Sequence, residues 1–163
     1  MKKLLIVLVL VIAGGIGAWF IWNPAPKAPE LAFTTIKGEQ LSMESLRGKV
    51  VLVKFWATSC VTCIKQMPDT IENYTRFHDR GFETIAVAMN YDPANYVLNY
   101  VETRNLPFKV VHDTKGEIAK GFGDVRLTPT AFLIDKQGRI VKRYLGEYDK
   151  ADFHATLEKA LAG

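Results

Sequence analysis

The stretch Phe55-Trp56-Ala57-Thr58-Ser59-Cys60-Val61-Thr62-Cys63 holds the only two cysteines of the chain, three positions apart. It follows Val50-Val51-Leu52-Val53, a run of branched apolar residues that predicts a buried β-strand. The residues after Cys60 have the pattern of a helix, so the pair lies where a strand leads into a helix N-terminus. Free N–H groups and the helix dipole stabilise a thiolate there, and the thiolate is the form of cysteine that attacks a disulfide.

Three other roles are open to the cysteine pair. A zinc site needs two further Cys or His ligands at short spacing, whereas His78, His112 and His154 are scattered along the chain. A purely structural disulfide would close so short a loop that it removes little chain entropy. Two buried, inert thiols are the third alternative. We favour redox chemistry, and we expect no metal site and no cofactor.

Length and composition set the limits for the rest. With 163 residues, 48% of them apolar, the chain is long enough for one globular domain with an ordinary core plus an appendage. Of the formal charge of +4, two units come from Lys2 and Lys3, so the remainder is nearly balanced. No Lys/Arg run with interleaved aromatic residues follows, and we therefore expect no nucleic-acid partner.

Residues 1–22 predict a membrane anchor. After the two lysines come nineteen uncharged residues, Leu4 through Trp22. As a helix this run spans about 30 Å, the thickness of a bilayer core, and its terminal aromatic residues favour the membrane interface. The lysines keep the N-terminus cytoplasmic, which places the rest of the chain across the membrane. A cleaved signal peptide is the alternative, because small residues occur near its middle.

Residues 23–30 predict a linker. Pro24, Pro26 and Pro29 alternate with other residues, and this pattern favours an extended, semi-rigid spacer of about 3 Å per residue. We expect it to hold the domain formed by residues 31–163 away from the lipid head groups.

The pattern within residues 31–163 predicts a mixed sheet with helices on both faces. An N-terminal hairpin around the turn Lys37-Gly38-Glu39 precedes the first core strand. We expect the helix after Cys60 to bend or restart at Pro68, and Asp92 to cap the next long helix. The expected strands are 50–55, 82–89, 110–111, 131–134 and 140–145, and the expected helices are 60–78, 93–104, 115–121 and 149–161.

This order of elements resembles the thioredoxin superfamily. The residues that carry the resemblance are Cys60-Val61-Thr62-Cys63 after a strand and Thr128-Pro129-Thr130 before a hairpin and a last helix. The anchor, the N-terminal hairpin, the approach Phe55-Trp56-Ala57-Thr58 and the phrase Pro129-Thr130-Ala131-Phe132-Leu133-Ile134-Asp135 look more closely like the TlpA/ResA group of anchored thiol–disulfide oxidoreductases. A C-x-x-C alone is a weak signal, but with the Thr-Pro and the hairpin it is a strong one.

The resemblance implies a role for each cysteine. Cys60 would attack a substrate disulfide, and Cys63 would resolve the mixed disulfide, leaving the pair oxidised and the substrate reduced. Pro129 matches the cis-proline of the family, which would turn the backbone of Thr128 outward to pair with an extended substrate segment. An ordinary trans proline is the alternative at this position.

Several positions depart from the family pattern. Ser59 replaces the usual Trp before the first cysteine, Thr62 replaces the usual Pro before the second, and Gln66 stands where ResA-like members carry a glutamate. The redox poise of the pair is therefore open. Together with Trp56, Val61 and Lys54, these residues are candidate modulators of the site.

Lys54 stands where thioredoxin has a buried aspartate. If Lys54 is buried near Cys63, it either favours the Cys63 thiolate or accepts the proton of the thiol. The alternative is a lysine at the strand end whose amine extends to water.

The expected function is a membrane-tethered reductase of protein disulfides. The resemblance implies a single-pass anchor in the bacterial inner membrane, with the domain in the periplasm or an equivalent extracytoplasmic space. That compartment is oxidising, so a reductase needs electrons from across the membrane. By resemblance, a membrane thiol transporter would supply them, and apocytochrome c or copper-site proteins would be substrates. A thiol oxidase or isomerase, and a Cu(I)-binding metallochaperone module using both thiolates, are the alternatives.

Overall fold

The computed structural model describes residues 25–163 of the chain, and the predicted anchor at residues 1–22 lies outside this range. Within residues 25–163 we find no helix with both the length and the apolar character that a membrane crossing requires.

A five-stranded mixed sheet forms the centre of the molecule, in the order β5-β4-β3-β6-β7. β3 runs parallel to β4, and β4 runs parallel to β5. β6 runs antiparallel to both β3 and β7, which form its two neighbours. The strands are β3 (Val50–Trp56), β4 (Phe82–Ala88), β5 (Lys109–His112), β6 (Thr130–Ile134) and β7 (Ile140–Leu145). The predicted mixed sheet and the β6–β7 hairpin are therefore confirmed.

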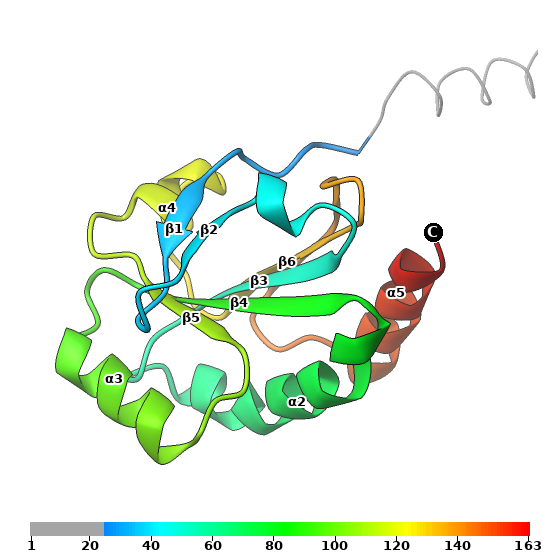
Figure 1. Cartoon of the computed structure of the whole chain (residues 1–163). Helices are drawn as coiled ribbons and strands as arrows, with labels where there is room; N and C mark the ends of the chain where they lie inside the picture. The colour runs from blue at the N-terminus through cyan, green and yellow to red at the C-terminus, as the bar shows by residue number, and fades with distance from the viewer. Residues whose placement is uncertain (1–24) are drawn as a thin grey trace, which may run out of the picture.

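Helices cover both faces of this sheet (Figure 1). α2 (Val61–Phe77), α3 (Ala94–Thr103) and α5 (Lys150–Ala162) lie on one face. The short α4 (Glu117–Gly121) lies on the other face, together with the antiparallel pair β1 (Ala32–Thr34) and β2 (Gln40–Ser42). Two short 3-10 helices, η1 (Glu44–Leu46) and η2 (His78–Arg80), complete the elements.

The central strand β3 is buried along its whole length. Because side chains alternate along a strand, Val51, Val53 and Phe55 pack into an apolar cluster on the α4 face. Val50, Leu52 and Trp56 pack beneath α2, α3 and α5 on the opposite face. Each buried side chain of this size contributes about 1.5–3 kcal/mol of transfer free energy, so both faces hold β3 in place. By the same alternation, Lys54 points to the face that α2 covers, together with Leu52 and Trp56.

The structure corrects the prediction about Pro68. α2 is a single α-helix from Val61 to Phe77 with Pro68 inside it, so the helix does not restart there. Proline removes only one backbone donor, and the buried Met67 and Phe77 on either side of it anchor the helix against the core.

The prediction that Asp92 caps α3 is also wrong. The N-cap of α3 is Pro93, without a side-chain cap. The Asp92 carboxylate instead accepts hydrogen bonds from Thr58, in the loop that follows β3. The cause is the parallel pairing of β3 and β4, whose carboxyl ends lie at the same edge of the sheet.

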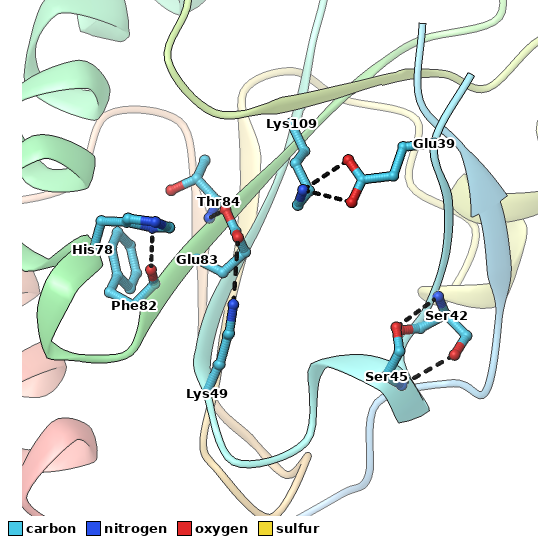
Figure 2. Close-up of polar contacts among 9 residues, drawn as sticks. All are labelled: Glu39, Ser42, Ser45, Lys49, His78, Phe82, Glu83, Thr84 and Lys109. Atoms are coloured by element: carbon cyan, nitrogen blue, oxygen red, sulfur yellow. Dashed lines mark hydrogen bonds and ion pairs between the residues drawn. The ribbon is translucent and has the colours of Figure 1, made fainter. Parts of the chain in front are cut away.

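The N-terminal β1–β2 pair is fastened to the edge strand β5 by polar contacts (Figure 2). The Lys109 amine donates to both carboxylate oxygens of Glu39, at 2.8 and 2.7 Å. Thr35 forms a backbone bridge to Val111. Ser42 and Ser45 bond to each other across the start of η1, where the Ser45 N–H donates to the Ser42 hydroxyl at 3.0 Å.

Part of the predicted linker is hydrogen-bonded to the domain. The Ala28 N–H donates to the Gly138 carbonyl at 2.9 Å, and the Ile140 N–H donates to the Pro26 carbonyl at 2.7 Å. Ala28 is 4% exposed. The chain from Pro26 onward is thus attached beside the turn between β6 and β7, and does not act as a free spacer there.

Candidate active site

Cys60 and Cys63 form a disulfide at the start of α2, with their Cα atoms 5.2 Å apart. Cys60 is the N-cap of the helix and is partly exposed, whereas Cys63 in the first turn is completely buried. A partner can therefore reach only the Cys60 sulfur from solvent. This asymmetry is the one that an attacking and a resolving thiol require.

The helix start supplies the electrostatics for a thiolate. The Cys60 sulfur accepts a hydrogen bond from the Cys63 N–H at 3.1 Å. No acidic residue occurs in the first turn of α2 to oppose an anion there. When the disulfide is reduced, the same N–H and the positive end of the helix dipole stabilise the Cys60 anion.

The Thr128–Pro129 peptide bond is cis, as the resemblance implies. Pro129 directly precedes β6, whose first residue Thr130 pairs with Phe55 of β3. β3 then continues into the loop that carries Cys60. The cis-proline and the disulfide therefore lie at the same edge of the sheet, on neighbouring strands. Pro129 is buried and Thr128 is partly exposed.

A buried carboxylate holds the loop between β3 and the disulfide. Asp92 is 2% exposed and accepts from the Thr58 N–H at 2.6 Å and from the Thr58 hydroxyl at 2.5 Å. Two hydrogen bonds to an ionised acceptor are worth more than two neutral ones. They fix the backbone two residues before Cys60.

Exposed apolar side chains lie next to Cys60 and next to Thr128 in the sequence. Val61, next to Cys60, is 82% exposed, and Leu127, next to Thr128, is 64% exposed. The hydroxyl of the exposed Tyr91 lies 3.3 Å from the Thr128 hydroxyl. Beside Ser59 the surface is hollowed into a cavity of about 540 Å³, lined in part by Tyr91 and Tyr96. An exposed apolar patch of this kind is typical of a site that binds another protein.

Lys54 is not at the end of its strand, so the expectation that its amine extends to water is wrong. It is 1% exposed. Its amine donates to the Thr70 hydroxyl at 2.8 Å and to the Gln66 side-chain oxygen at 3.2 Å. The amine also lies 5.7 Å from the centre of the Tyr148 ring. Burial lowers the pKa of Lys54 to about 8, against a partial opposing effect of Asp69.

The remaining candidate modulators surround the pair in different ways. Trp56 is fully buried against Tyr100 of α3, with ring centres 5.3 Å apart. Ser59 and Val61 are exposed and Thr62 is partly exposed, so these three side chains border the reactive edge. Gln66 is buried and contacts Lys54, one turn along α2 from Cys63.

Sequence reasoning missed Asp92, Thr70 and Tyr91 as members of this site. An Asp-Pro pair directly after a strand parallel to β3 was a usable signal for Asp92, because the carboxyl ends of parallel strands share an edge. Thr70 lies two turns after Cys63 on α2, and its spacing places it on the same helix face. Only the tertiary structure brings Tyr91 to Thr128.

The comparisons with known proteins agree with this geometry. The Redoxin family model matches residues 24–161. The thiol-disulfide oxidoreductase ResA of Bacillus thuringiensis subsp. konkukian is 37% identical over 134 residues, which cover 82% of this chain and 76% of that protein.

Solved structures give the same result. A candidate thioredoxin from Neisseria meningitidis superposes with a TM-score of 0.80 at 33% identity, covering 86% of this chain and 93% of the other. A thiol:disulfide interchange protein of the thioredoxin family from Chlorobium tepidum gives 0.77 at 29% identity, covering 85% and 98%. With its thioredoxin-like fold and its Cys60–Cys63 disulfide, the chain belongs to the Redoxin family and is a ResA/TlpA-like thiol–disulfide oxidoreductase.

Proposed function

We propose that this oxidoreductase reduces disulfides of other proteins on the far side of a bacterial inner membrane, to which residues 1–22 tether it. The observation that carries the proposal is the asymmetry of the pair, with a partly exposed Cys60 at a helix start and a buried Cys63 behind it. The charged Lys2-Lys3 and the apolar run after them support the tether and the location.

The chemistry follows from the two sulfurs. The Cys60 thiolate attacks one sulfur of the substrate disulfide, forming a mixed disulfide and releasing the other substrate sulfur as a thiolate. Cys63 loses its proton and attacks the Cys60 sulfur, and this breaks the mixed disulfide. The substrate leaves as a dithiol, and the Cys60–Cys63 bond is restored with the two electrons accounted for.

The substrate segment binds in an extended form beside Pro129. Thr128 offers backbone groups at the edge of β6, and main-chain pairing of this kind is a common way to hold a peptide strand. The exposed Val61, Leu127 and Tyr91 add apolar contacts on both sides of Cys60. Each cycle leaves the pair oxidised, so a membrane thiol transporter has to restore the dithiol. Haem-binding cysteines of apocytochrome c or the cysteines of copper-site proteins are substrates of suitable chemistry.

A trapping experiment tests the proposal. A Cys63→Ser variant, expressed at native level with its N-terminal segment, should accumulate mixed disulfides through Cys60, because the resolving thiol is lost. The matched control is the Cys60→Ser, Cys63→Ser double variant, which should trap nothing. Failure of the wild-type protein to speed insulin reduction by dithiothreitol, together with no trapped partner, would refute the proposal.

A thiol oxidase or isomerase is the second candidate, and the buried Lys54 cation favours it. A positive charge near the pair stabilises its reduced, anionic form and makes the disulfide more oxidising. Equilibration with glutathione separates the two functions. A reduction potential at or above about −150 mV would contradict the reductase role.

A further inference from the structure

Lys54 is the one cation among residues 25–163 that is buried in the core. It occupies the central strand β3, and its register partners are Ala86 on β4 and Ala131 on β6. One small alanine on each neighbouring strand leaves room for a long side chain beneath α2. The site is thus shaped to hold the lysine inside the protein.

The amine contacts the face of α2 that also carries Cys63. Its two acceptors, Gln66 and Thr70, are three and seven residues after Cys63, positions that share one face of a helix. At a rise of about 1.5 Å per residue, Gln66 is about 4.5 Å and Thr70 about 10 Å further along the helix axis than Cys63. Cys63, Gln66 and Thr70 are all buried on this face. The charge of Lys54 therefore lies on the same buried helix face as the resolving sulfur, one to two turns further along α2, in a region that water does not screen.

Among residues 25–163, no anion is paired with this charge while the disulfide is intact. Both hydrogen-bond acceptors of Lys54 are neutral. The nearest acidic group, Asp69 on α2, is bound to Lys150 of α5 at 2.8 Å. The Tyr148 ring lies 5.7 Å from the amine, and the His154 ring of α5 bonds to Asn73. The remaining ionisable side chains of α2 and α5 are Lys65, Glu72, Tyr74, Arg76, Asp152, Glu158 and Lys159, and none of them contributes to the pKa shift of Lys54.

We propose that Lys54 is a positioning charge for the Cys60–Cys63 pair, whose buried amine stabilises the thiolate formed on reduction and holds one of the two protons that accompany it. The inference deepens the proposed function and rests on it for its role in the cell. Reduction supplies the anion that the lysine lacks in the oxidised protein.

The step balances in electrons and protons. A donor dithiol gives two electrons and two protons, forms its own disulfide, and breaks the Cys60–Cys63 bond. Where the Lys54 amine is neutral in the oxidised protein, one proton binds to a cysteine sulfur and the other to Lys54, leaving one thiolate beside an ammonium group. In the reverse step Lys54 returns its proton as the thiolate attacks. The lowered pKa of Lys54 supports this role, because it puts proton uptake near physiological pH.

The first test needs no substitution. The Cε carbon of Lys54 is followed by NMR against pH in the oxidised protein and in the fully reduced protein. The expected result is a pKa at least one unit higher in the reduced protein, because a neighbouring thiolate favours the ammonium form. Equal titration curves in the two redox states would overturn the proposal.

The second test measures the glutathione equilibrium at pH 6.5. In the Lys54→Met variant the disulfide should be at least tenfold harder to reduce than in the wild type, which equals about 30 mV for a two-electron couple. The matched control is Lys65→Met, which removes an exposed cation two residues from Cys63, paired with Glu147 at 3.0 Å. We expect a shift below threefold there, because water screens an exposed charge. Equal shifts in the two variants would contradict a specific effect of burial.

These tests stand apart from the proposed function. Both are measured on the purified protein in defined redox states, so they give a result whether the protein acts as a reductase or as an oxidase. A protein that traps no partner but shows the Lys54 coupling would refute the cellular role alone. Should Lys54→Met fail to fold, the NMR titration of the wild type still decides the question.

Discussion

Glu83 and Lys54 are both 1% exposed, yet the surroundings of these two charged side chains differ. Glu83 lies near the start of β4, far from the disulfide. One carboxylate oxygen accepts from the Thr84 N–H at 3.0 Å, and the other lies 3.9 Å from the Lys49 amine (Figure 2). Lys54 lies near the end of β3, on the opposite face, with only neutral acceptors. One charge has an ion-pair partner, while the other has two neutral acceptors and no counter-ion in the described part of the chain, on the helix face that also carries Cys63.

The comparison shows how to separate a structural charge from a functional one. Buried charges need partners, because removal from water costs several kcal/mol per ion. The buried Asp92, Asp113 and Asp135 follow this rule through hydrogen bonds to backbone N–H groups and side chains. Lys54 has two neutral acceptors for the three N–H donors of its ammonium form, so one donor is left without a protein partner within the residues that the structure describes. Buried groups of this kind with a shifted pKa concentrate at reactive sites.

The largest expected effect is on the pH dependence of stability. The pKa of Lys54 is about 8 in the folded protein, against an ordinary value of 10.5. Between these values the unfolded chain binds more protons, so this group makes the folded protein more stable as pH rises through the interval. The penalty for burying the charge is complete below pH 8. Relative to Lys54→Met, the wild type should gain about 3 kcal/mol from pH 7.5 to 10.5.

Urea unfolding of the two oxidised proteins across that range measures this gain. The unfolding free energy of Lys65→Met, which removes an exposed charge, should change with pH in the same way as that of the wild type. Parallel curves for Lys54→Met as well would mean that Lys54 is solvated, and the contrast with Glu83 would then disappear.

The next effect concerns Asp92, a buried charge that is satisfied but lies beside the disulfide. Asp92→Ala leaves the Thr58 N–H and hydroxyl without acceptors, and should cost about 2 kcal/mol of unfolding free energy. Denaturant melts measure this loss, with Glu102→Ala on the exposed side of α3 as a control near zero. A cost equal to that of the control would show that the loop needs no tether.

A smaller effect sharpens the description of the Lys54 site. Thr70→Val removes one of the two acceptors of the ammonium group and should lower the pKa of Lys54 further. It should cost about 1.5 kcal/mol below pH 8 and less above it, where the amine is neutral. A loss of unfolding free energy that does not change with pH would show that the hydroxyl does not stabilise the charge of Lys54. The measurement is urea unfolding at pH 7 and pH 10.

The smallest effect belongs to Glu83. Glu83→Gln keeps an oxygen for the Thr84 N–H and loses only a long ion pair to a half-exposed lysine, so we expect a change below about 1 kcal/mol. The glutathione equilibrium of the disulfide should not change. A tenfold shift in this variant would show that charge anywhere in the sheet tunes the pair, against the local role of Lys54.

The sequence predicted the fold well because the signals are local. The apolar run at 50–55, the Cys60–Cys63 spacing and the turn before Ile140 each act over a few residues. The burial of Lys54 was harder to predict. The strand continues through Trp56, and only this full length shows that the lysine is inside the strand and not at its end. Asp92 before Pro93 has the pattern of a helix cap, and the competing partner, Thr58, lies 34 residues earlier in the chain. Partners brought together by a sheet leave no local pattern.

The attachment of Pro26 and Ala28 beside the β6–β7 turn has a mechanical consequence. That turn lies near the first residue of β3. Cys60 follows the last residue of this strand, about 20 Å away for a seven-residue strand. Under the proposed membrane tether, the Cys60 sulfur therefore lies at the edge of the sheet opposite to the attached segment. Under the same proposal, an electron donor in the membrane reaches the Cys60 sulfur only when the whole domain rotates.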